Sequence, residues 1–226
     1  MGNICIIPAR GGSKRIPRKN IKEFLGKPII TYSIKAATDS KLFDEVMVST
    51  DDEDIANIAK KYGAKIPFIR SQKNSDDFAT TYDVIREVIQ NFKDNGKEFD
   101  NLCCIYPCAP FVTKEILIKA YAQLKENNFD TVFPIIAYSF PIQRALRKDG
   151  DKVSMILEEN INIRSQDLED SFHDAGQFYW CKTEQLMKSK RLLTSNTGGV
   201  VISELEAQDI DTKTDWKLAE LKYQLK

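Results

Sequence analysis

A basic loop near the start of the chain has the composition of a polyphosphate-binding loop. It spans residues 8–20 and reads PARGGSKRIPRKN. Two adjacent glycines let the backbone approach a ligand closely and offer its N–H groups to an anion. The groups that could contact a phosphate are Arg10, Gly11, Gly12, Ser13, Lys14, Arg15, Arg18 and Lys19. The loop lacks both GxxxxGK[ST] and GxGxxG spacing, so it would bind phosphate by a different pattern. A solvated basic turn is the alternative, and the glycines and serine disfavour it.

An acidic pair near the end of the chain could hold a metal ion. Asp209 and Asp211 lie in the segment QDIDT, and in extended backbone they project to the same side. Mg²⁺ is usually held by one or two protein carboxylates together with substrate phosphates. Asp-x-Asp alone is a weak signal that helix-capping acids also give. Together with a triphosphate-type loop, it predicts a magnesium site that would complete an electrostatic clamp around a reacting phosphorus.

Alternating strand and helix patterns indicate how these segments are positioned. Short apolar runs predict strands at residues 3–7, 45–50, 65–69, 102–106, 131–136, 176–181 and 199–203. Helical periodicity predicts helices at residues 28–37, 52–62, 80–92, 113–127 and 216–225. Thr80 or Thr81 would cap the third helix, and Thr212 with Asp215 would form a capping box before the last. The order predicts an α/β, Rossmann-like fold with a mostly parallel sheet and helices on both faces.

The basic loop follows the first predicted strand, and open parallel sheets bind ligands at the carboxyl ends of their strands. The length fits a single domain over residues 1–226. Residues 138–172 are irregular and dense in charge. We expect this segment to leave the core, either as a lid or as an arm that reaches a partner subunit.

Composition excludes several classes of protein. Lysine plus arginine and aspartate plus glutamate both total 33, which argues against a general nucleic-acid or membrane-surface binder. No apolar run could cross a bilayer, and the start lacks a signal-peptide pattern, so we expect a cytoplasmic protein. The only histidine is His173, which excludes multi-histidine metal sites. No CxxC spacing occurs, and buried reduced thiols are expected at Cys5, Cys103, Cys104, Cys108 and Cys181.

The basic loop and the acidic pair, in this order, resemble those of the CMP-sugar synthetases, cytidylyltransferases that activate sialic acid and related 2-keto acids. The resemblance covers nearly the whole chain and rests on ARGGSKRIPRKN, on VSTDD at residues 48–52 and on DIDT at residues 209–212. It implies transfer of CMP from CTP to the anomeric hydroxyl of an acidic nine-carbon sugar, with release of pyrophosphate. It also implies Mg²⁺ as cofactor and a homodimer.

The same resemblance assigns roles to particular residues. The CTP-binding set would be Arg10, Gly11, Gly12, Ser13, Lys14, Lys19, Asn20 and Arg70. Arg10 and Lys19 would stabilise the charge that builds up during transfer, together with a metal on Asp209 and Asp211. The general base stays open between Asp209, acting through a metal-bound water, and acidification of the hydroxyl by the metal itself. Ser71 stands where the family has a proline after the arginine.

Departures from the sialic-acid enzymes bear on the sugar. YPCAPFV at residues 106–112 replaces QPTSPLR, and DAGQFYW at residues 174–180 replaces an NGA-type segment. Both replacements, and RSQDL at residues 164–168, resemble the pseudaminic acid branch of the family.

Three residues are candidates for binding the sugar. The planar guanidinium of Arg164 matches a carboxylate. Gln177 could bind the N-acyl groups, and Tyr179, Phe178 or Phe140 could form an apolar wall. Strand alternation turns Phe178 and Trp180 to the opposite side, where we expect them to pack in the core.

Other functions remain open at this point. The same reaction could use N-acetylneuraminic, legionaminic or 3-deoxy-octulosonic acid. A glycosyltransferase could use Asp-x-Asp, but the basic loop suits a full triphosphate better than a diphosphate sugar. A non-catalytic nucleotide sensor would not need the acidic pair. If residues 138–172 cross to a partner subunit, Arg164 could serve the neighbour's pocket.

Overall fold

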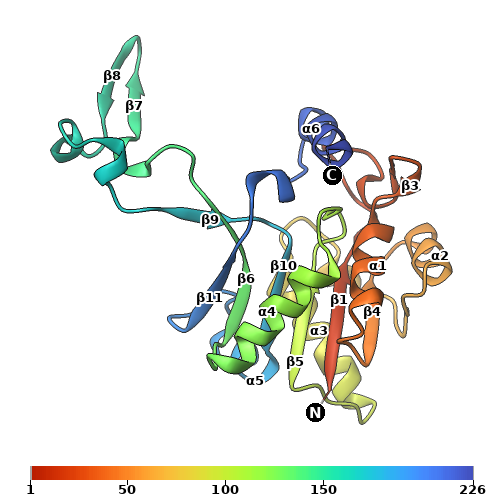
Figure 1. Cartoon of the computed structure of the whole chain (residues 1–226). Coiled ribbons are helices and arrows are strands. Elements are labelled where there is room, and N and C mark those ends of the chain that lie inside the picture. The colour runs from red at the N-terminus through yellow and green to blue at the C-terminus, as the bar shows by residue number, and fades with distance from the viewer. Residues whose placement is uncertain (1, 226) are drawn as a thin grey trace.

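A seven-stranded sheet forms the centre of the molecule, in a computed structural model that describes residues 2–225 (Figure 1). Its order is β11-β6-β10-β5-β1-β4, and β9 pairs with β6 beside this path. Strands β1, β4, β5, β6 and β11 run in one direction, whereas β9 and β10 are antiparallel to their neighbours. The predicted mostly parallel sheet is confirmed. The strands are β1 (Asn3–Pro8), β4 (Glu45–Ser49), β5 (Asn101–Ile105), β6 (Thr131–Ala137), β9 (Phe172–Asp174), β10 (Phe178–Lys182) and β11 (Thr197–Val201).

Helices cover both faces of this sheet, as expected from the alternating pattern. One face packs against α1, α2 and α4, and the other against α3 and α5. The helices are α1 (Ile30–Ser40), α2 (Glu53–Lys61), α3 (Thr81–Asp94), α4 (Lys114–Glu126), α5 (Thr183–Ser189) and α6 (Lys213–Gln224). Within residues 2–225, no helix has the length and apolar character that crossing a membrane requires.

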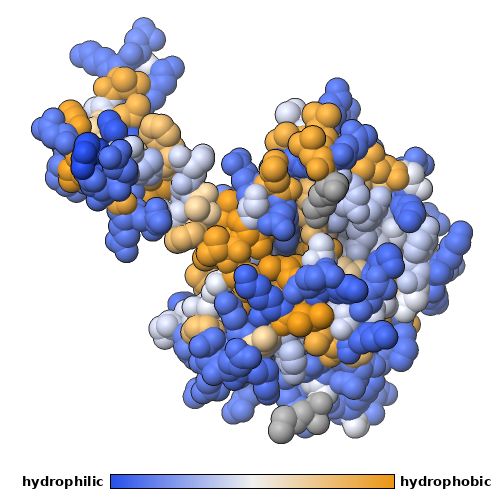
Figure 2. All heavy atoms as spheres, viewed as in Figure 1, coloured by the Kyte–Doolittle hydropathy of each residue, from blue (hydrophilic) through white to orange (hydrophobic). Residues whose placement is uncertain are grey.

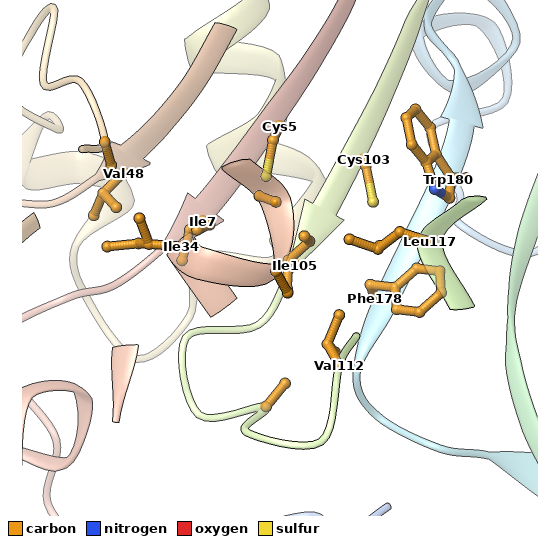
Figure 3. Close-up of a cluster of buried hydrophobic side chains, with 14 of the residues drawn as sticks. Cys5, Ile7, Ile34, Val48, Cys103, Ile105, Val112, Leu117, Phe178 and Trp180 are labelled. Atoms are coloured by element: carbon orange, nitrogen blue, oxygen red, sulfur yellow. The ribbon is translucent and has the colours of Figure 1, made fainter. Parts of the chain in front are cut away.

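The central strands are buried on both faces, which explains their continuous apolar runs. In β1, Cys5 and Ile7 point to the α1/α4 side, and Ile4 and Ile6 point to the α3 side. Figure 3 shows the first of these clusters, in which side chains from β1, β5 and β10 meet those of α1 and α4. There Trp180 is fully buried and stacks on Phe43, with ring centroids 4.9 Å apart.

Local sequence signals identified most elements but not all of them. Thr80 with Asp83 and Thr212 with Asp215 form capping boxes, so the predicted caps of α3 and α6 are confirmed, although α6 begins at Lys213 rather than at residue 216. The strand predicted at residues 65–69 is wrong. Only an isolated bridge between Met47 and Lys65 forms there. Pro67 lacks the backbone N–H that would donate a hydrogen bond to a neighbouring strand. Helix α5 was not predicted, because its seven residues are too few to show a clear period.

Residues 138–172, which we call the arm, extend away from the sheet between β6 and β9 (Figure 1). The arm contains an antiparallel hairpin of β7 (Leu146–Asp149) and β8 (Lys152–Met155), which does not pair with the central sheet. Large apolar side chains on the arm are exposed, among them Phe140, Leu146, Val153 and Ile161.

Candidate active site

An open cavity of about 650 Å³ lies where β1 and β5 end. The carboxyl ends of parallel strands are the usual ligand site of such sheets. Segments far apart in the sequence meet here: the basic loop, the residues after β5, the stretch around residue 80 and the acidic pair. The predicted site residues that line the cavity are Arg10, Ser13, Lys14, Lys19, Asn20, Arg70, Asp209 and Asp211.

Hydrogen bonds and ion pairs connect the basic loop to the residues at the start of α2. The backbone N–H of Gly11 donates to Asp51 at 2.9 Å, and Arg18 forms ion pairs with Asp52 and Asp54. A Cβ atom on Gly11 would lie 2.7 Å from an Asp52 carboxylate oxygen. Glycine is therefore required at position 11 by close approach, whereas a Cβ on Gly12 would meet no atom within 4 Å.

The acidic pair contacts the basic loop directly. Lys19 Nζ donates to the carbonyl of Ile210 at 2.7 Å, across 191 positions of sequence, and lies 3.3 Å from Asp211. Arg15 forms a second ion pair with Asp211 at 2.9 Å. Partial desolvation, followed by the negative charge of Asp211, raises the pKa of Asp209. Asp211 is thus held by cations, while Asp209 keeps an unfavourable negative charge.

A small hydrophobic cluster beneath the cavity holds both segments in place. Ile16 of the basic loop and Ile210, between the two aspartates, are buried in it with Phe24 and with Trp216 of α6. Lys22 lies over the Trp216 ring, 4.1 Å from its centroid. The loop and the acidic pair are therefore positioned by one shared core.

Asp209 and Asp211 have the donor chemistry that Mg²⁺ prefers, because carboxylate oxygens are hard ligands. Among residues 2–225, no group of three or more His, Cys, Asp or Glu side chains could enclose a metal. A cation at this pair would need further oxygen ligands from substrate phosphates and water, which is the usual arrangement for Mg²⁺. The residues present fit such an ion.

Arg70 forms part of the cavity wall from a largely buried position. Its guanidinium donates to the Ser49 hydroxyl at 3.0 Å and to the Ser49 carbonyl. Burial lowers the pKa of Arg70 to about 10, so the side chain is still charged at neutral pH. The cavity therefore has a fixed positive group well away from the basic loop in sequence.

Several cavity residues were missed by sequence reasoning. Asp77 forms ion pairs with Arg10, at 2.8 Å, and with Lys14. Tyr106 lies with its hydroxyl 3.3 Å from that of Thr81. The position of Tyr106 directly after a buried strand was a usable signal, whereas nothing in the sequence distinguishes Asp77 from other surface acids. The missed residues are Asp77, Thr80, Thr81, Tyr106 and Cys108.

The predicted sugar-binding residues do not line the cavity. Arg164 lies on the arm and forms an ion pair with Asp167 at 2.7 Å. Gln177 is 2% exposed and donates to the Glu206 carbonyl, and Tyr179 is 6% exposed and donates to Asp174. Contact of these three side chains with a sugar stays a prediction.

The two aromatic residues on the other side of β10 behave as expected. Phe178 and Trp180 have no exposed surface and belong to the core in Figure 3. Their predicted packing is confirmed.

Known proteins resemble this chain over its whole length. A family model described as Cytidylyltransferase matches residues 4–195. The pseudaminic acid cytidylyltransferase of Campylobacter jejuni serotype O:2 is 42% identical, over 100% of this chain and 97% of the relative. The CMP-N,N'-diacetyllegionaminic acid synthase of Legionella pneumophila is 29% identical, over 96% and 94%. The solved structure of a CMP:2-keto-3-deoxy-manno-octonic acid synthetase complexed with CTP has a similar fold, with a TM-score of 0.71, 17% identity and coverage of 100% and 98%.

Proposed function

The chain belongs to the cytidylyltransferase family, and we propose that it transfers CMP from CTP to the anomeric hydroxyl of pseudaminic acid, releasing pyrophosphate. The observation that carries this proposal is the single cavity in which a cationic glycine-containing loop faces a pair of carboxylates. The full-length similarity to a pseudaminic acid cytidylyltransferase supports the choice of sugar.

The basic loop would bind the triphosphate. Arg10 and Lys14 both contact the carboxylate of Asp77, so their charged ends already converge on one anionic group within the cavity. Ser13 and Asn20 add polar groups to the same wall, and Arg70 adds a cation. The carbonyl of Arg10 accepts from the Asn20 amide at 2.9 Å, which orients both residues.

In-line attack of the sugar hydroxyl on the α-phosphorus builds negative charge on the phosphoryl oxygens and on the departing pyrophosphate. Arg10 and Lys19 would stabilise this charge, because preorganised cations cost no reorganisation when the reaction occurs. Lys19 is suited to this role because the Ile210 carbonyl and Asp211 hold its ammonium group beside the acidic pair.

Asp209 and Asp211 would hold Mg²⁺ in the proposed reaction. The ion would neutralise phosphate charge and orient the triphosphate. Asp209 completes the proposed catalytic set with Arg10 and Lys19, since a bound cation would offset the desolvation and the charge of Asp211 that disfavour its ionised form.

A homodimer is the proposed assembly. The arm exposes large apolar side chains, which in soluble proteins usually mark an interaction surface. Arg164 lies on this arm and does not line the cavity of its own chain, so we propose that it serves the partner's site and binds the sugar carboxylate. Gln177 and Tyr179 are proposed to contact the sugar after side-chain movement.

We propose the cytoplasm as the place of action. All five cysteines are free thiols in the part of the chain described, and four of them are buried. Free thiols persist where the environment is reducing.

Pyrophosphate release tests the substrate. CTP and Mg²⁺ would be incubated with pseudaminic, legionaminic, N-acetylneuraminic or 3-deoxy-octulosonic acid, each offered separately. We expect release only with pseudaminic acid. Release with another acid alone would contradict the sugar assignment while keeping the reaction class, and CTP binding without release by any acid would indicate a nucleotide sensor.

A further inference from the structure

Directly after Arg70 the chain forms a turn over residues 71–75, and the carboxylate of Glu87 on α3 holds this turn by hydrogen bonds. Glu87 accepts hydrogen bonds from the Ser71 N–H at 2.7 Å, from the Ser71 hydroxyl at 2.7 Å and from the Asn74 amide. Burial alone would raise the pKa of Glu87, but these hydrogen bonds outweigh it and hold the pKa below its ordinary value. An ionised carboxylate with three donors is a strong and directional anchor.

The anchored turn separates two groups that face the cavity. Before it, Arg70 lines the cavity and its backbone N–H donates to the Thr50 carbonyl at 2.9 Å. After it, the Asp76 carbonyl accepts from Arg10 at 2.6 Å, and Asp77 pairs with the same arginine. A shift of the turn would therefore move both groups relative to the basic loop.

On the basis of the proposed function, we propose that Glu87 is a positioning residue of the CTP site, which fixes Arg70 and the Asp77 loop by binding Ser71 and Asn74. Glu87 does not line the cavity itself. Its influence would reach the nucleotide through the turn and through the attraction between its charge and that of Arg70.

The backbone at Ser71 gives this role a second line of support. Ser71 has φ −64° and ψ 150°, and proline is locked near the same φ. Serine has no ring to fix φ, but it has an N–H and a hydroxyl, and Glu87 binds both. In this chain, the hydrogen bonds to Glu87 would hold the φ angle of residue 71, which a proline ring would fix covalently.

A proline at position 71 and the hydrogen bonds from Ser71 to Glu87 should exclude each other. A proline ring carbon at position 71 would lie along the direction in which the Ser71 N–H points to Glu87, so the carboxylate would have to turn away. Removing Glu87 should therefore matter when residue 71 is serine and should matter little in a Ser71→Pro background.

The test measures CTP binding by calorimetry in the wild type, Glu87→Ala, Ser71→Pro and the double variant. We expect Glu87→Ala to weaken CTP binding roughly tenfold, since hydrogen bonds to a charged group are among the stronger ones. The double variant should bind CTP within about threefold of Ser71→Pro alone. Glu87→Gln keeps the size of the side chain and should give a smaller loss. In turnover assays, KM for CTP should rise while KM for the sugar stays unchanged.

Gln90→Ala is the matched control, because Gln90 is exposed on the same helix and contacts only Asp94 among the described hydrogen bonds. It should leave CTP binding unchanged. Unchanged CTP affinity in folded Glu87→Ala and Glu87→Gln would overturn the inference, as would an equal loss with serine or proline at position 71. If the wild type binds CTP but releases no pyrophosphate with any acid, the proposed function fails, whereas the affinity comparison still decides the role of Glu87.

Discussion

At the level of single residues, the two aspartates of the acidic pair differ in their surroundings. Asp211 has cationic partners in Arg15 and Lys19. The pKa of Asp209 is raised by partial desolvation and by the charge of Asp211. Residues at functional sites are often held in states that cost stability. Asp209 fits that description, because partial desolvation and the charge of Asp211 outweigh the nearby positive charge of Lys19.

This difference predicts that neutralising Asp209 raises the stability of the protein and lowers its activity. A raised pKa means that the fold favours protonated Asp209, so its contribution to stability is present at low pH and is lost as pH rises through the folded-state pKa. Asp209→Asn should therefore raise Tm at pH 7, by an amount that shrinks towards pH 4. It should also reduce turnover roughly 100-fold or more, as removal of charge-stabilising groups commonly does.

Thermal unfolding followed by circular dichroism at several pH values checks the stability part. Asp211→Asn is the control, because it loses two ion pairs and should not raise Tm. A lower Tm for Asp209→Asn at pH 7 would contradict the assignment of Asp209 as the strained member of the pair.

Gly11 and Gly12 offer a second prediction at this scale. Gly11→Ala would place a Cβ against Asp52, which cannot shift freely because it also caps α2 and binds Arg18. We expect a loss of about 1–3 kcal/mol in the free energy of unfolding, as for other overpacked sites.

Gly12→Ala is the matched variant, because the added Cβ meets open space. It should stay within about 0.5 kcal/mol of the wild type, as most surface substitutions do. Urea unfolding measures both values, and equal costs for the two alanines would contradict the close approach at Gly11.

At the level of elements, the hydrophobic cluster under the cavity connects stability with chemistry. Ile210→Ala should cost about 2–5 kcal/mol, the range for buried isoleucine truncation. Because Ile210 lies between the metal-binding candidates, we also expect weaker binding of Mg²⁺, so that more metal is required for the half-maximal rate.

Leu124→Ala on α4 is the control, because Leu124 is fully buried in a different cluster. It should cost similar stability without changing the Mg²⁺ requirement, when both variants are assayed well below their Tm. An equal shift in the two variants would indicate a general loss of stability rather than a displaced acidic pair.

The elements also show why the sequence predicted some features and not others. Capping boxes and amphipathic stripes are local, so α3 and α6 could be located from the sequence alone. The antiparallel direction of β10 depends on which strands it joins, and no local pattern encodes that choice. The composition of residues 8–20 identified the basic loop, but Asp77 enters the cavity through a turn that Glu87 of α3 holds by side-chain hydrogen bonds, which no local pattern encodes.

At the level of the whole molecule, the arm exposes large apolar side chains that no other part of residues 2–225 covers. Figure 2 shows hydrophobic residues on the arm and along its junction with the body. The most exposed of them include Phe140 and Val153, at 71% and 64%. The proposed homodimer would bury this surface.

We predict a dimer in sedimentation velocity at micromolar protein, and a monomer would contradict the proposed assembly. Phe140→Ser combined with Ile161→Ser should raise the dimer dissociation constant by about 100-fold or more, given the burial energy of large apolar side chains. Leu193→Ser is the control, since Leu193 is 57% exposed but lies outside the arm. It should leave the dimer intact.

In the proposed reaction, the anomeric oxygen of the sugar bonds to the α-phosphorus of CTP, while the bond from that phosphorus to the α,β-bridging oxygen breaks and pyrophosphate leaves. The most direct measurement uses CTP labelled with ³²P at either the α or the γ position, with Mg²⁺ and pseudaminic acid. We expect the α label to appear in a CMP-sugar and the γ label in pyrophosphate. Label from the α position found only in free CMP or unchanged CTP, in protein that is folded and binds CTP, would contradict it.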